Sequence, residues 1–262
     1  MPEAAKRILD TRSLATAHRR LAQLLRPGAR VLDVGCGTGA ITQGIARAVG
    51  PAGLVVGLDN NTALIEAAHA AHKDEPRLSF VLGDAYDLPF RGAFDVVTAS
   101  RVLQWLAEPR RALAGMVAAV VPGGRVVILD YNHEQVNWVP DPPEAMRKFY
   151  AQFLAWRAEA GLDNAIADHL AKLFEAGGLT DIRVTPQQET ATRGDPQFAA
   201  ALRIWADVAA SRGRQMVADG SISEAQRSAA EREYLDWIVR GAQTQSLYLL
   251  AVEGTRPKPV SR

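Results

Sequence analysis

The chain has 262 residues, of which 48% are hydrophobic, and its 30 basic residues nearly balance its 29 acidic ones. This length is ample for one large α/β domain, and the balanced charge argues against nucleic acid or an anionic membrane as a partner. The single cysteine, Cys36, excludes an intrachain disulfide and a cysteine metal cluster. No apolar run approaches the roughly 20 residues needed to span a bilayer, and the charged start of the chain lacks a signal peptide's apolar run. We therefore expect a soluble cytoplasmic protein.

The first half of the chain predicts one helix and then alternating strands and helices. Apolar residues near helical spacing at 4–25 indicate an N-terminal helix within residues 1–28, which Pro27-Gly28 ends. The elements predicted after it are strands at 29–35, 54–59, 78–85, 94–100 and 125–131 and helices at 39–49, 62–72 and 110–120. This alternation predicts a parallel α/β sheet covered on both faces. Right-handed crossovers make it doubly wound and Rossmann-like, with a ligand crevice beyond the carboxyl ends of the strands.

The second half of the chain departs from this alternation. Residues 195–243 are mostly helical in pattern, with breaks at Gly213 and Gly220. The other predicted elements are a proline-marked loop leading into an amphipathic helix at 134–163, a helix at 163–179, and strands at 181–188 and 246–254. These strands complete a seven-stranded, mostly parallel sheet with an antiparallel last strand. We expect one domain at 29–254, whose helical insertions at about 134–163 and 190–243 form a lid, and a disordered tail at 255–262.

The stretch VLDVGCGTGAIT at 31–42 places three glycines where the first strand turns into a helix. Such a turn lets the backbone approach a ligand closely. Two ligands fit this pattern. The nicotinamide dinucleotide fingerprint G-x-G-x-x-G/A is met by Gly35, Gly37 and Ala40, and Asp59 lies 24 positions after Gly35, close to the expected ribose-binding carboxylate. The alternative ligand is S-adenosylmethionine.

Three features favour S-adenosylmethionine. Asp33 precedes the glycines by two residues, where its carboxylate would repel a pyrophosphate but attract the ammonium and sulfonium of S-adenosylmethionine. Asp84, in the Gly83-Asp84-Ala85 stretch that ends the third strand, places another carboxylate where an adenine amino group could donate to it. The last two strand signals, with a long excursion between them, suit a sheet that ends in an antiparallel insertion.

The ordered motifs resemble those of the class I S-adenosylmethionine-dependent methyltransferases. They are VLDVGCGTG at 31–39, GLD at 57–59, GDA at 83–85, FDVV at 94–97 and PGG at 122–124. The resemblance spans about residues 29–130 and continues more weakly to 254. Within the class, the chain is similar to the small-molecule branch that includes the ubiquinone and menaquinone C-methyltransferases.

The resemblance implies a set of cofactor-binding residues. Those implied for the methionine end are Asp33 and the turn residues Gly35, Cys36, Gly37 and Gly39. Asp59 would accept from the ribose hydroxyls, with Asn60 beside the adenine. Asp84 would accept from the adenine amino group, with the Ala85 backbone next to it, and Ser100 and Arg101 would face the methionine part near the methyl group. As alternatives, Asp33 could cap the glycine turn and Asp84 could be an ordinary turn aspartate.

The acceptor is expected at the ends of the fourth and fifth strands. The candidate substrate-binding residues there are Gln104, Trp105, Tyr131 and Trp138. His133 is the candidate base, because an unperturbed imidazole accepts a proton near neutral pH; the alternative is a capping or lid-stabilising histidine. The fourth strand ends in TASR and lacks the Asn/Asp-Pro-Pro-aromatic run of nucleic-acid and glutamine methyltransferases. No cluster of ligands has metal-binding spacing.

These observations predict an enzyme that moves a methyl group from S-adenosylmethionine to a small organic acceptor. Methyl transfer from a sulfonium is an in-line displacement, so the protein mainly aligns the acceptor and excludes water beneath the lid. Two alternatives are a non-catalytic protein that binds S-adenosylmethionine and an NAD(P)-dependent oxidoreductase. The sequence leaves open the acceptor, the methylated atom (O, N or C) and the oligomeric state, for which a homodimer is one alternative.

Overall fold

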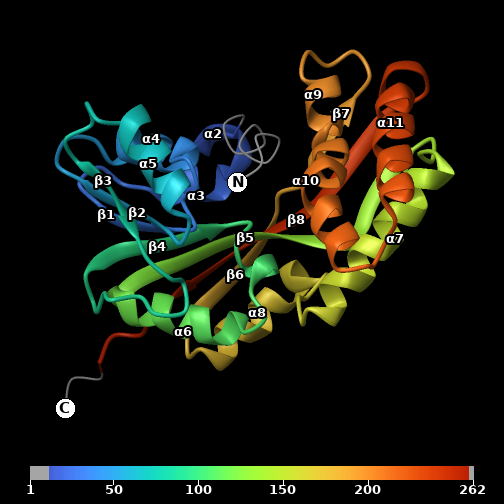
Figure 1. Ribbon diagram of the computed structural model, residues 1–262. Coiled ribbons are helices and arrows are strands. Elements are labelled where there is room, and N and C mark those ends of the chain that lie inside the picture. Colours follow the sequence, from blue (N-terminus) through green and yellow to red (C-terminus); the bar gives the residue numbers. More distant parts are fainter. Residues whose placement is uncertain (1–11, 260–262) are drawn as a thin grey trace. The chain divides into compact units, whose positions relative to one another are not determined.

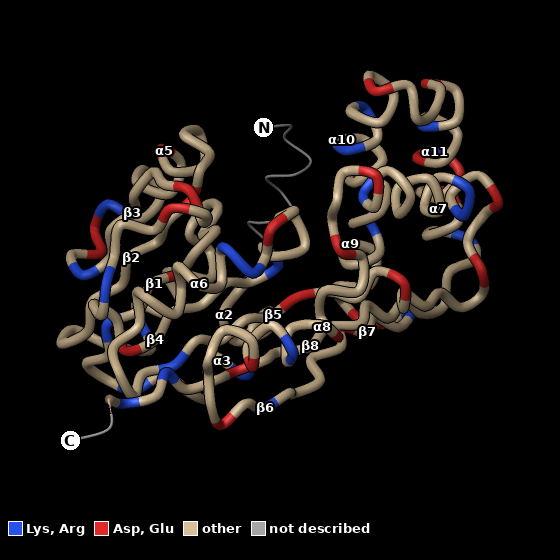
Figure 2. The backbone as a smooth tube through the Cα atoms, turned by 90° about the horizontal axis from the view of Figure 1, so that it is seen from below, with Lys and Arg blue, Asp and Glu red and all other residues tan. Residues whose placement is uncertain are grey.

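The computed structural model describes residues 12–259, and within them the chain forms two compact units (Figure 1). The sheet unit comprises residues 12–131, 166–187 and 249–259. The helical unit comprises residues 132–165 and 188–248. Basic and acidic residues are distributed along both units (Figure 2), as the near-neutral net charge leads one to expect.

The strands form a Rossmann-like sheet, as the sequence predicts. They are β1 Arg30–Val34, β2 Leu54–Asp59, β3 Leu78–Leu82, β4 Phe94–Ser100, β5 Val120–Val139, β6 Thr180–Pro186, β7 Glu189–Thr192 and β8 Thr244–Thr255. Within the described residues the sheet has eight strands in the order β3-β2-β1-β4-β5-β8-β6, with β7 also paired to β8. The pairs from β3 to β5 are parallel, whereas β6 and β7 pair with β8 antiparallel.

The seven strands that the sequence predicts form the main path of the sheet, and β7, which was not predicted, pairs with β8 off this path. Its sequence, ETAT at 189–192, is short and polar, and it lacks the alternation of apolar residues by which a strand is recognised. It forms because its backbone pairs with β8, from Glu189 beside Leu247 to Thr192 beside Thr244. A strand formed by distant pairing leaves no local signal.

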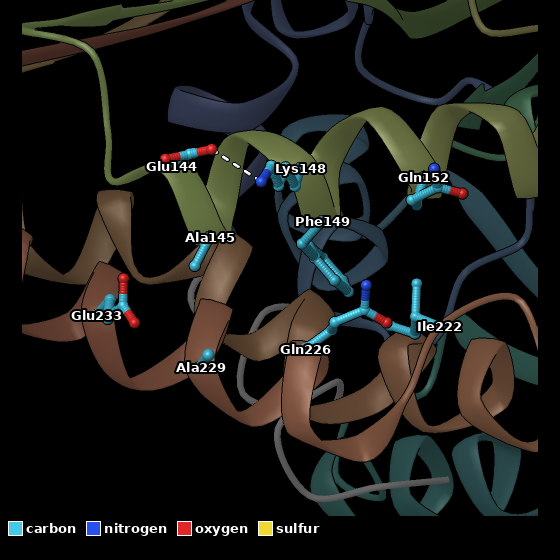
Figure 3. A pocket seen from close by; sticks show the side chains of 9 residues that line it. All are labelled: Glu144, Ala145, Lys148, Phe149, Gln152, Ile222, Gln226, Ala229 and Glu233. Atoms are coloured by element: carbon cyan, nitrogen blue, oxygen red, sulfur yellow. Dashed lines mark ion pairs between the residues drawn. The ribbon is translucent and has the colours of Figure 1, made fainter.

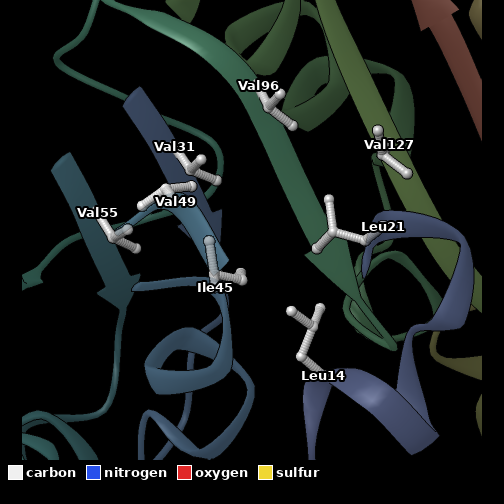
Figure 4. Packing of buried hydrophobic residues seen from close by; sticks show 8 residues of the cluster. All are labelled: Leu14, Leu21, Val31, Ile45, Val49, Val55, Val96 and Val127. Carbon is white, nitrogen blue, oxygen red and sulfur yellow. The ribbon is translucent and has the colours of Figure 1, made fainter. Parts of the chain in front are cut away.

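The helices of the sheet unit are α2 Leu14–Ala17, α3 Arg19–Leu24, α4 Ala40–Val49, α5 Thr62–Ala71, α6 Pro109–Ala119, α8 Ile166–Ala176 and the 3-10 turn η1 Leu103–Trp105. Leu14 and Leu21 pack into a core with α4 and the sheet (Figure 4), whose other members are Val31, Ile45, Val49, Val55, Val96 and Val127. This packing joins the N-terminal segment to the sheet.

The prediction of one continuous helix at 4–25 is wrong in its described part. The segment breaks at His18, whose backbone dihedrals of −147° and 62° are not helical. The imidazole is fully buried, with Nε2 3.4 Å from the Thr98 hydroxyl. The break thus turns a polar ring toward a polar partner inside the unit. The beginning of the predicted helix, residues 4–11, lies outside the described residues.

The helices of the helical unit are α7 Glu144–Glu159, α9 Phe198–Leu202, α10 Ile204–Ala218 and α11 Glu224–Arg240. Two local predictions were wrong here. Residues 134–139 extend β5 instead of forming a loop. Gly213 lies inside α10, where a Cβ would lie 2.9 Å from Arg227 Cγ, so this glycine permits close helix packing and does not end the helix. Gly220, with a φ of +76°, does follow the end of α10.

The first residues of the tail that the sequence predicts to be disordered, 255–262, are hydrogen-bonded to the sheet unit. Thr255 belongs to β8, and the Arg256 amide donates to the Gly124 carbonyl at 2.9 Å. The Arg256 carbonyl accepts from the Gly123 amide at 2.7 Å. The prediction is therefore wrong for Thr255 and Arg256, while residues 260–262 lie outside the described residues. Among the helices of residues 12–259, none has the length and apolar character needed to cross a lipid bilayer.

Candidate functional site

The glycine turn after β1 has a backbone that other residues rarely adopt. Gly35, Gly37 and Gly39 have φ angles of +73°, +57° and +81°. A Cβ on Gly35 would lie 2.4 Å from Val102 Cγ2, and one on Gly39 would lie 2.6 Å from Phe80 Cζ. Real Cβ atoms do not come this close, so both the dihedral angles and the space require glycine.

The Asp59 carboxylate ties the end of β2 to this turn. Its Oδ2 accepts from the Gly37 amide at 2.9 Å, and its Oδ1 accepts from the Asn61 amide at 3.0 Å. The Leu58 carbonyl also accepts from the amides of Gly35 and Cys36 at 2.6 and 3.0 Å. Asp59 therefore orders the turn in addition to its predicted role at the ribose. Asn60, beside it, is exposed at the end of β2.

Asp33 is a buried carboxyl group just beneath the turn, with 3% of its surface exposed. Its Oδ2 accepts from the Thr42 hydroxyl at 2.7 Å. Burial, helped by the nearby Asp59 charge and opposed by the Thr42 hydrogen bond, raises the pKa of Asp33 to about 7. Its charge is therefore poised to respond to a nearby cation at neutral pH. Cys36 is also buried, which raises the pKa of its thiol and keeps it neutral.

A small cavity of about 30 Å³ lies against the glycine turn. Its lining comes from the segment before α2, β1, the turn, α4 and the end of β4, and consists of Arg12, Asp33, Gly35, Cys36, Thr38, Ala40, Ile41 and Ser100. Arg12 and Thr38 are not among the predicted site residues. Thr38 lies within the glycine motif and could have been found from that position, whereas Arg12 lies outside every motif.

Asp84 and Ala85 follow β3, and Asp84 is exposed. The Asp84 Oδ1 accepts from the Tyr86 amide at 2.9 Å, which is the turn-forming contact that we gave as the alternative. No residue within 12–259 donates to its Oδ2, so that oxygen is available to a ligand. The turn role and the adenine role are compatible, and the adenine role stays a prediction.

Ser100 ends β4, and Arg101 follows it in an unusual conformation. Arg101 has a φ of +62° and only 4% of its surface exposed. Its Nε donates to the Tyr131 hydroxyl at 2.9 Å, and its Nη1 donates to the Ser100 hydroxyl at 3.0 Å and the Ala17 carbonyl at 3.2 Å. The structure thus brings Ser100, Arg101 and Tyr131, three of the predicted site residues, into one hydrogen-bonded group.

Gln104 belongs to η1, the turn that follows this group. It is 2% exposed, its side-chain amide donates to the Arg101 carbonyl at 3.2 Å, and its backbone amide donates to Asp130 Oδ2 at 3.2 Å. These contacts hold the loop after β4 in place. Trp105, predicted beside it at the acceptor site, is half-buried.

His133, the candidate base, lies in an aromatic cluster of the helical unit. Its ring meets Phe153 and Trp205 edge-on, each with 6.1 Å between ring centres. Burial and the positive charge of Arg157 lower the pKa of His133 well below its ordinary value. The Tyr150 hydroxyl donates to its carbonyl at 2.6 Å. An imidazole with so low a pKa is a weak base, so these surroundings favour a structural role for His133 over the role of a base.

Trp138 lies in the same cluster of the helical unit. Its Nε1 donates to Gln245 Oε1 at 3.0 Å and to the Tyr234 hydroxyl at 3.1 Å. Its ring meets Tyr150 edge-on, with 5.1 Å between centres. Both its polar atom and its ring therefore have partners within the unit, which gives Trp138 a part in holding the cluster together.

The helical unit also has a larger cavity, of about 380 Å³, between α7 and α11 (Figure 3). Lys148 and Glu144 form an ion pair of 2.8 Å at its edge, and Phe149 and Ile222 contribute apolar surface. Its lining includes none of the residues that the sequence selects as site residues. The polar groups at the strand ends of the sheet unit therefore remain the candidate site.

Comparison with known proteins identifies the family. A family model described as a methyltransferase domain matches residues 32–128. The demethylmenaquinone methyltransferase of Lactococcus lactis is 31% identical over 169 residues, which cover 59% of this chain and 67% of that protein. The chain belongs to the class I S-adenosylmethionine-dependent methyltransferases. The predicted family, enzyme class and cofactor are thereby confirmed.

Two further methyltransferases extend the comparison. The 2-phytyl-1,4-naphtoquinone methyltransferase of Thermosynechococcus vestitus is 36% identical over 129 residues, covering 49% of this chain and 56% of that protein. The chain thus spans little more than half the length of this curated relative. A structure of Haemonchus contortus phosphoethanolamine N-methyltransferase 2 with S-adenosylhomocysteine superposes with a TM-score of 0.58 at 18% identity, over 94% of this chain and 52% of that one. At this identity the likeness is one of fold.

The residues of the site fit the cofactor of this methyltransferase family. Carboxylates stand at or near the carboxyl ends of three adjacent parallel strands, β1, β2 and β3, as Asp33, Asp59 and Asp84. These acids suit a ligand that carries an ammonium and a sulfonium and no phosphate. The Thr38 hydroxyl is buried and has no hydrogen-bond partner within residues 12–259, so a polar ligand atom would satisfy it.

Proposed function

We propose that this methyltransferase transfers a methyl group from S-adenosylmethionine to a small, quinone-related acceptor. The observation that carries the proposal is the glycine turn with carboxyl groups at the ends of β1, β2 and β3. The names of two relatives, a demethylmenaquinone and a 2-phytyl-1,4-naphtoquinone methyltransferase, support the acceptor class.

The cofactor-binding residues follow the order of the strands. Those proposed for the methionine end are Asp33, Gly35, Cys36, Gly37 and Gly39. Asp59 binds the ribose hydroxyls, with Asn60 beside the adenine, and Asp84 and the Ala85 backbone bind the adenine edge. Ser100 and Arg101 border the reacting methyl group, and Tyr131 holds the Arg101 guanidinium in place.

S-adenosylmethionine supplies an activated methyl group whose leaving group is a neutral thioether. The chain's own residues therefore need to align the acceptor with that methyl group and exclude water, which can lower the barrier by about 7–11 kcal/mol in favourable cases. We assign His133 to packing within the helical unit, because its pKa is too low for an efficient base near neutral pH. The lid role of residues 134–163 and 190–243 stays a prediction.

Calorimetry and methyl transfer together test this proposal. We expect the purified chain to bind S-adenosylhomocysteine and not NADH. Asp59→Ala is expected to weaken this binding by about ten- to a hundredfold, because it removes a charged acceptor from both the ribose and the turn. Labelled S-adenosylmethionine should methylate reduced quinone precursors more readily than nucleic acid or peptides.

The alternatives give different results in the same assays. Binding of S-adenosylhomocysteine without transfer to any acceptor in the panel would favour the non-catalytic binder. Stabilisation by NADH alone would favour the oxidoreductase. Transfer to other small molecules, with quinone precursors inert, would contradict only the proposed acceptor class.

A further inference from the structure

The break in the N-terminal segment lies directly beside Arg101. A continuous helix would use the Ala17 carbonyl for the amide of Leu21, four residues further on. Because α2 ends at Ala17 and His18 is not helical, this carbonyl is available instead, and Arg101 Nη1 donates to it at 3.2 Å. A carbonyl at the end of a helix thereby becomes an acceptor for a side chain of the candidate site.

The Arg101 guanidinium is enclosed by the sheet unit. The residue is 4% exposed and has a φ of +62°, a conformation that persists only where the surrounding contacts hold it. Two of the oxygens to which it donates, the hydroxyls of Ser100 and Tyr131, belong to β4 and β5. The Ala17 carbonyl comes from the N-terminal segment, so the guanidinium joins that segment to the ends of the two strands.

The break is stabilised by the burial of His18. The imidazole is fully buried, with Nε2 3.4 Å from the Thr98 hydroxyl of β4. Burial and the positive charge of Arg101 lower the pKa of His18 to about 3, so the ring is neutral near pH 7 and places no second cation beside the guanidinium. Leu14 and Leu21, on either side of the break, pack into the same core (Figure 4).

Arg20, two residues after the break, anchors the segment to residues far along the chain. Its Nη2 donates to Glu253 Oε1 on β8 at 2.8 Å, and its Nε donates to the other oxygen of that carboxylate. Its backbone amide donates to the Gln187 side chain at 2.7 Å. Glu253 is 5% exposed and also accepts from Arg125 of β5 at 3.3 Å. A two-bond ion pair with so buried a carboxylate fixes the start of α3.

We propose that the ion pair of Arg20 positions Arg101 for methyl transfer, because it fixes the carbonyl at which the helix breaks. The inference rests on the proposed place of Arg101 beside the reacting methyl group. Arg20 is a positioning residue, which acts through Arg101 and takes no part in bond making. Its contribution to the rate is alignment, since a displacement of about 1 Å near a reacting group can slow a reaction about a hundredfold.

Exchange of the Arg101 Nε–H with water tests the proposal in the chain without cofactor. NMR observes this proton, and Arg101→Lys identifies its signal as the one that disappears. Its burial and its hydrogen bond to Tyr131 should make the exchange slow in the wild type. Arg20→Gln removes the anchor and leaves Glu253 paired with Arg125, so the chain should fold. We expect this variant to accelerate the exchange about tenfold, as the loss of one hydrogen bond implies.

Methyl transfer provides the functional measurement. In Arg20→Gln, kcat is expected to fall about three- to tenfold, while the affinity for S-adenosylhomocysteine in calorimetry stays within about twofold of the wild type. A residue that served folding alone would change neither the exchange nor kcat once both proteins are folded. Arg20→Lys keeps the cation without the two parallel hydrogen bonds, so its exchange rate and kcat should lie between those of the wild type and Arg20→Gln.

Arg30→Gln is the matched control. Arg30 donates its Nη2 and Nε to the two oxygens of Asp95 at 2.8 and 3.2 Å, so the variant loses an ion pair of the same kind in the same unit. This pair lies near the starts of β1 and β4, whereas Arg101 follows the end of β4. The exchange and kcat should therefore stay within about twofold of the wild type. If Arg20→Gln does not fold, Arg20→Lys takes its place, and faster exchange in it supports the proposal.

The contrary outcomes are distinct. An exchange rate that Arg20→Gln leaves unchanged would overturn the proposal. Equal acceleration in Arg30→Gln would overturn it too, because the effect would be a general loosening of the unit. Faster exchange with an unchanged kcat would contradict the positioning role. A wild type that transfers no methyl group would contradict the proposed function, whereas the exchange rates would still decide whether Arg20 orients Arg101.

Discussion

The glycine turn of the sheet unit and the aromatic cluster of the helical unit hold their polar groups with partners at very different separations along the chain. In the sheet unit, the hydroxyl of Thr42 donates to Asp33 nine residues away, and the Gly37 amide donates to Asp59 22 residues away. In the helical unit, the indole of Trp138 donates to Tyr234 and Gln245, which are 96 and 107 residues away. The cofactor turn is thus a local structure, whereas the aromatic cluster depends on chain segments that meet only in the fold.

This difference predicts that stability and cofactor binding can be changed separately. Trp205 is 3% exposed and lies at the centre of the aromatic cluster, with 4.7 Å between its ring centre and that of Tyr150. Trp205→Ala removes a large buried ring and is expected to lower the free energy of unfolding by about 3–5 kcal/mol. Denaturant unfolding followed by fluorescence measures this loss.

The same variant should leave S-adenosylhomocysteine affinity within about twofold of the wild type, because Trp205 and the glycine turn belong to different compact units. Leu113→Ala, a comparable truncation buried in α6, is a matched control for general destabilisation in the sheet unit. A large loss of cofactor affinity in Trp205→Ala alone would show that the two units are energetically coupled.

Gly35→Ala is the converse test, in which the glycine turn is changed and the aromatic cluster is not. The substitution forces a Cβ to within 2.4 Å of Val102 Cγ2 at a φ of +73°. We expect the free energy of unfolding to fall by about 2–4 kcal/mol, because alanine is unfavourable in the left-handed conformation and its Cβ overlaps Val102. The affinity for S-adenosylhomocysteine should fall with it. Gly50→Ala is the matched control, because Gly50 has a φ of +66° but no atom within 4 Å of its added Cβ. A Gly50→Ala loss as large as that of Gly35→Ala would attribute the effect to dihedral strain alone.

The same contrast explains which features could be predicted from the sequence. Alternating apolar segments predict β1 to β5 and α4 to α6 because each forms from its own residues. The glycine motif likewise predicts the turn and its neighbours, Asp33 and Asp59. Their geometry could be anticipated because parallel strands bring their carboxyl ends to one edge.

Other features depend on distant pairing and leave no local signal. The strand β7 forms by pairing with β8. The Arg20 side chain, in the N-terminal segment, pairs with Glu253, which lies 233 residues away along the chain. Arg12 reaches the cavity through the packing of Leu14 on α4, which its own sequence neighbourhood does not reveal. The surroundings of His133 also arise from long-range packing, and they lower the pKa that the sequence alone leaves at its ordinary value.

The raised pKa of Asp33 predicts that cofactor binding depends on pH. Only the ionised carboxylate attracts the ligand ammonium, so the complex lowers a pKa that stands at about 7 without ligand. Affinity for S-adenosylhomocysteine should therefore be full above pH 7 and fall below it, by at most about tenfold per pH unit. Calorimetry across this range measures the slope. Asp33→Asn should bind weakly and without this slope, and an unchanged slope in that variant would assign the titration to another group.

The smallest expected effect concerns His72, which supports the turn from α5. Its Nε2 lies 3.2 Å from the Thr38 carbonyl, and its ring packs against Phe80 with 5.7 Å between centres. His72→Phe keeps the ring and loses the hydrogen bond, whereas His72→Asn keeps a donor and loses the ring. We expect His72→Phe to weaken S-adenosylhomocysteine binding by about three- to tenfold, as the loss of one hydrogen bond implies.

The control is His69→Phe, in the helix α5 that His72 caps. His69 also meets Phe80, with 5.8 Å between ring centres, but it is exposed and makes no hydrogen bond to Thr38. It should change the affinity by less than about twofold. If His72→Asn restores the affinity that His72→Phe loses, the hydrogen bond to the turn carries the effect. If His72→Phe keeps the affinity and His72→Asn loses it, ring packing against Phe80 carries the effect. The cofactor turn then depends on the side chains packed behind it, as the aromatic cluster depends on its rings.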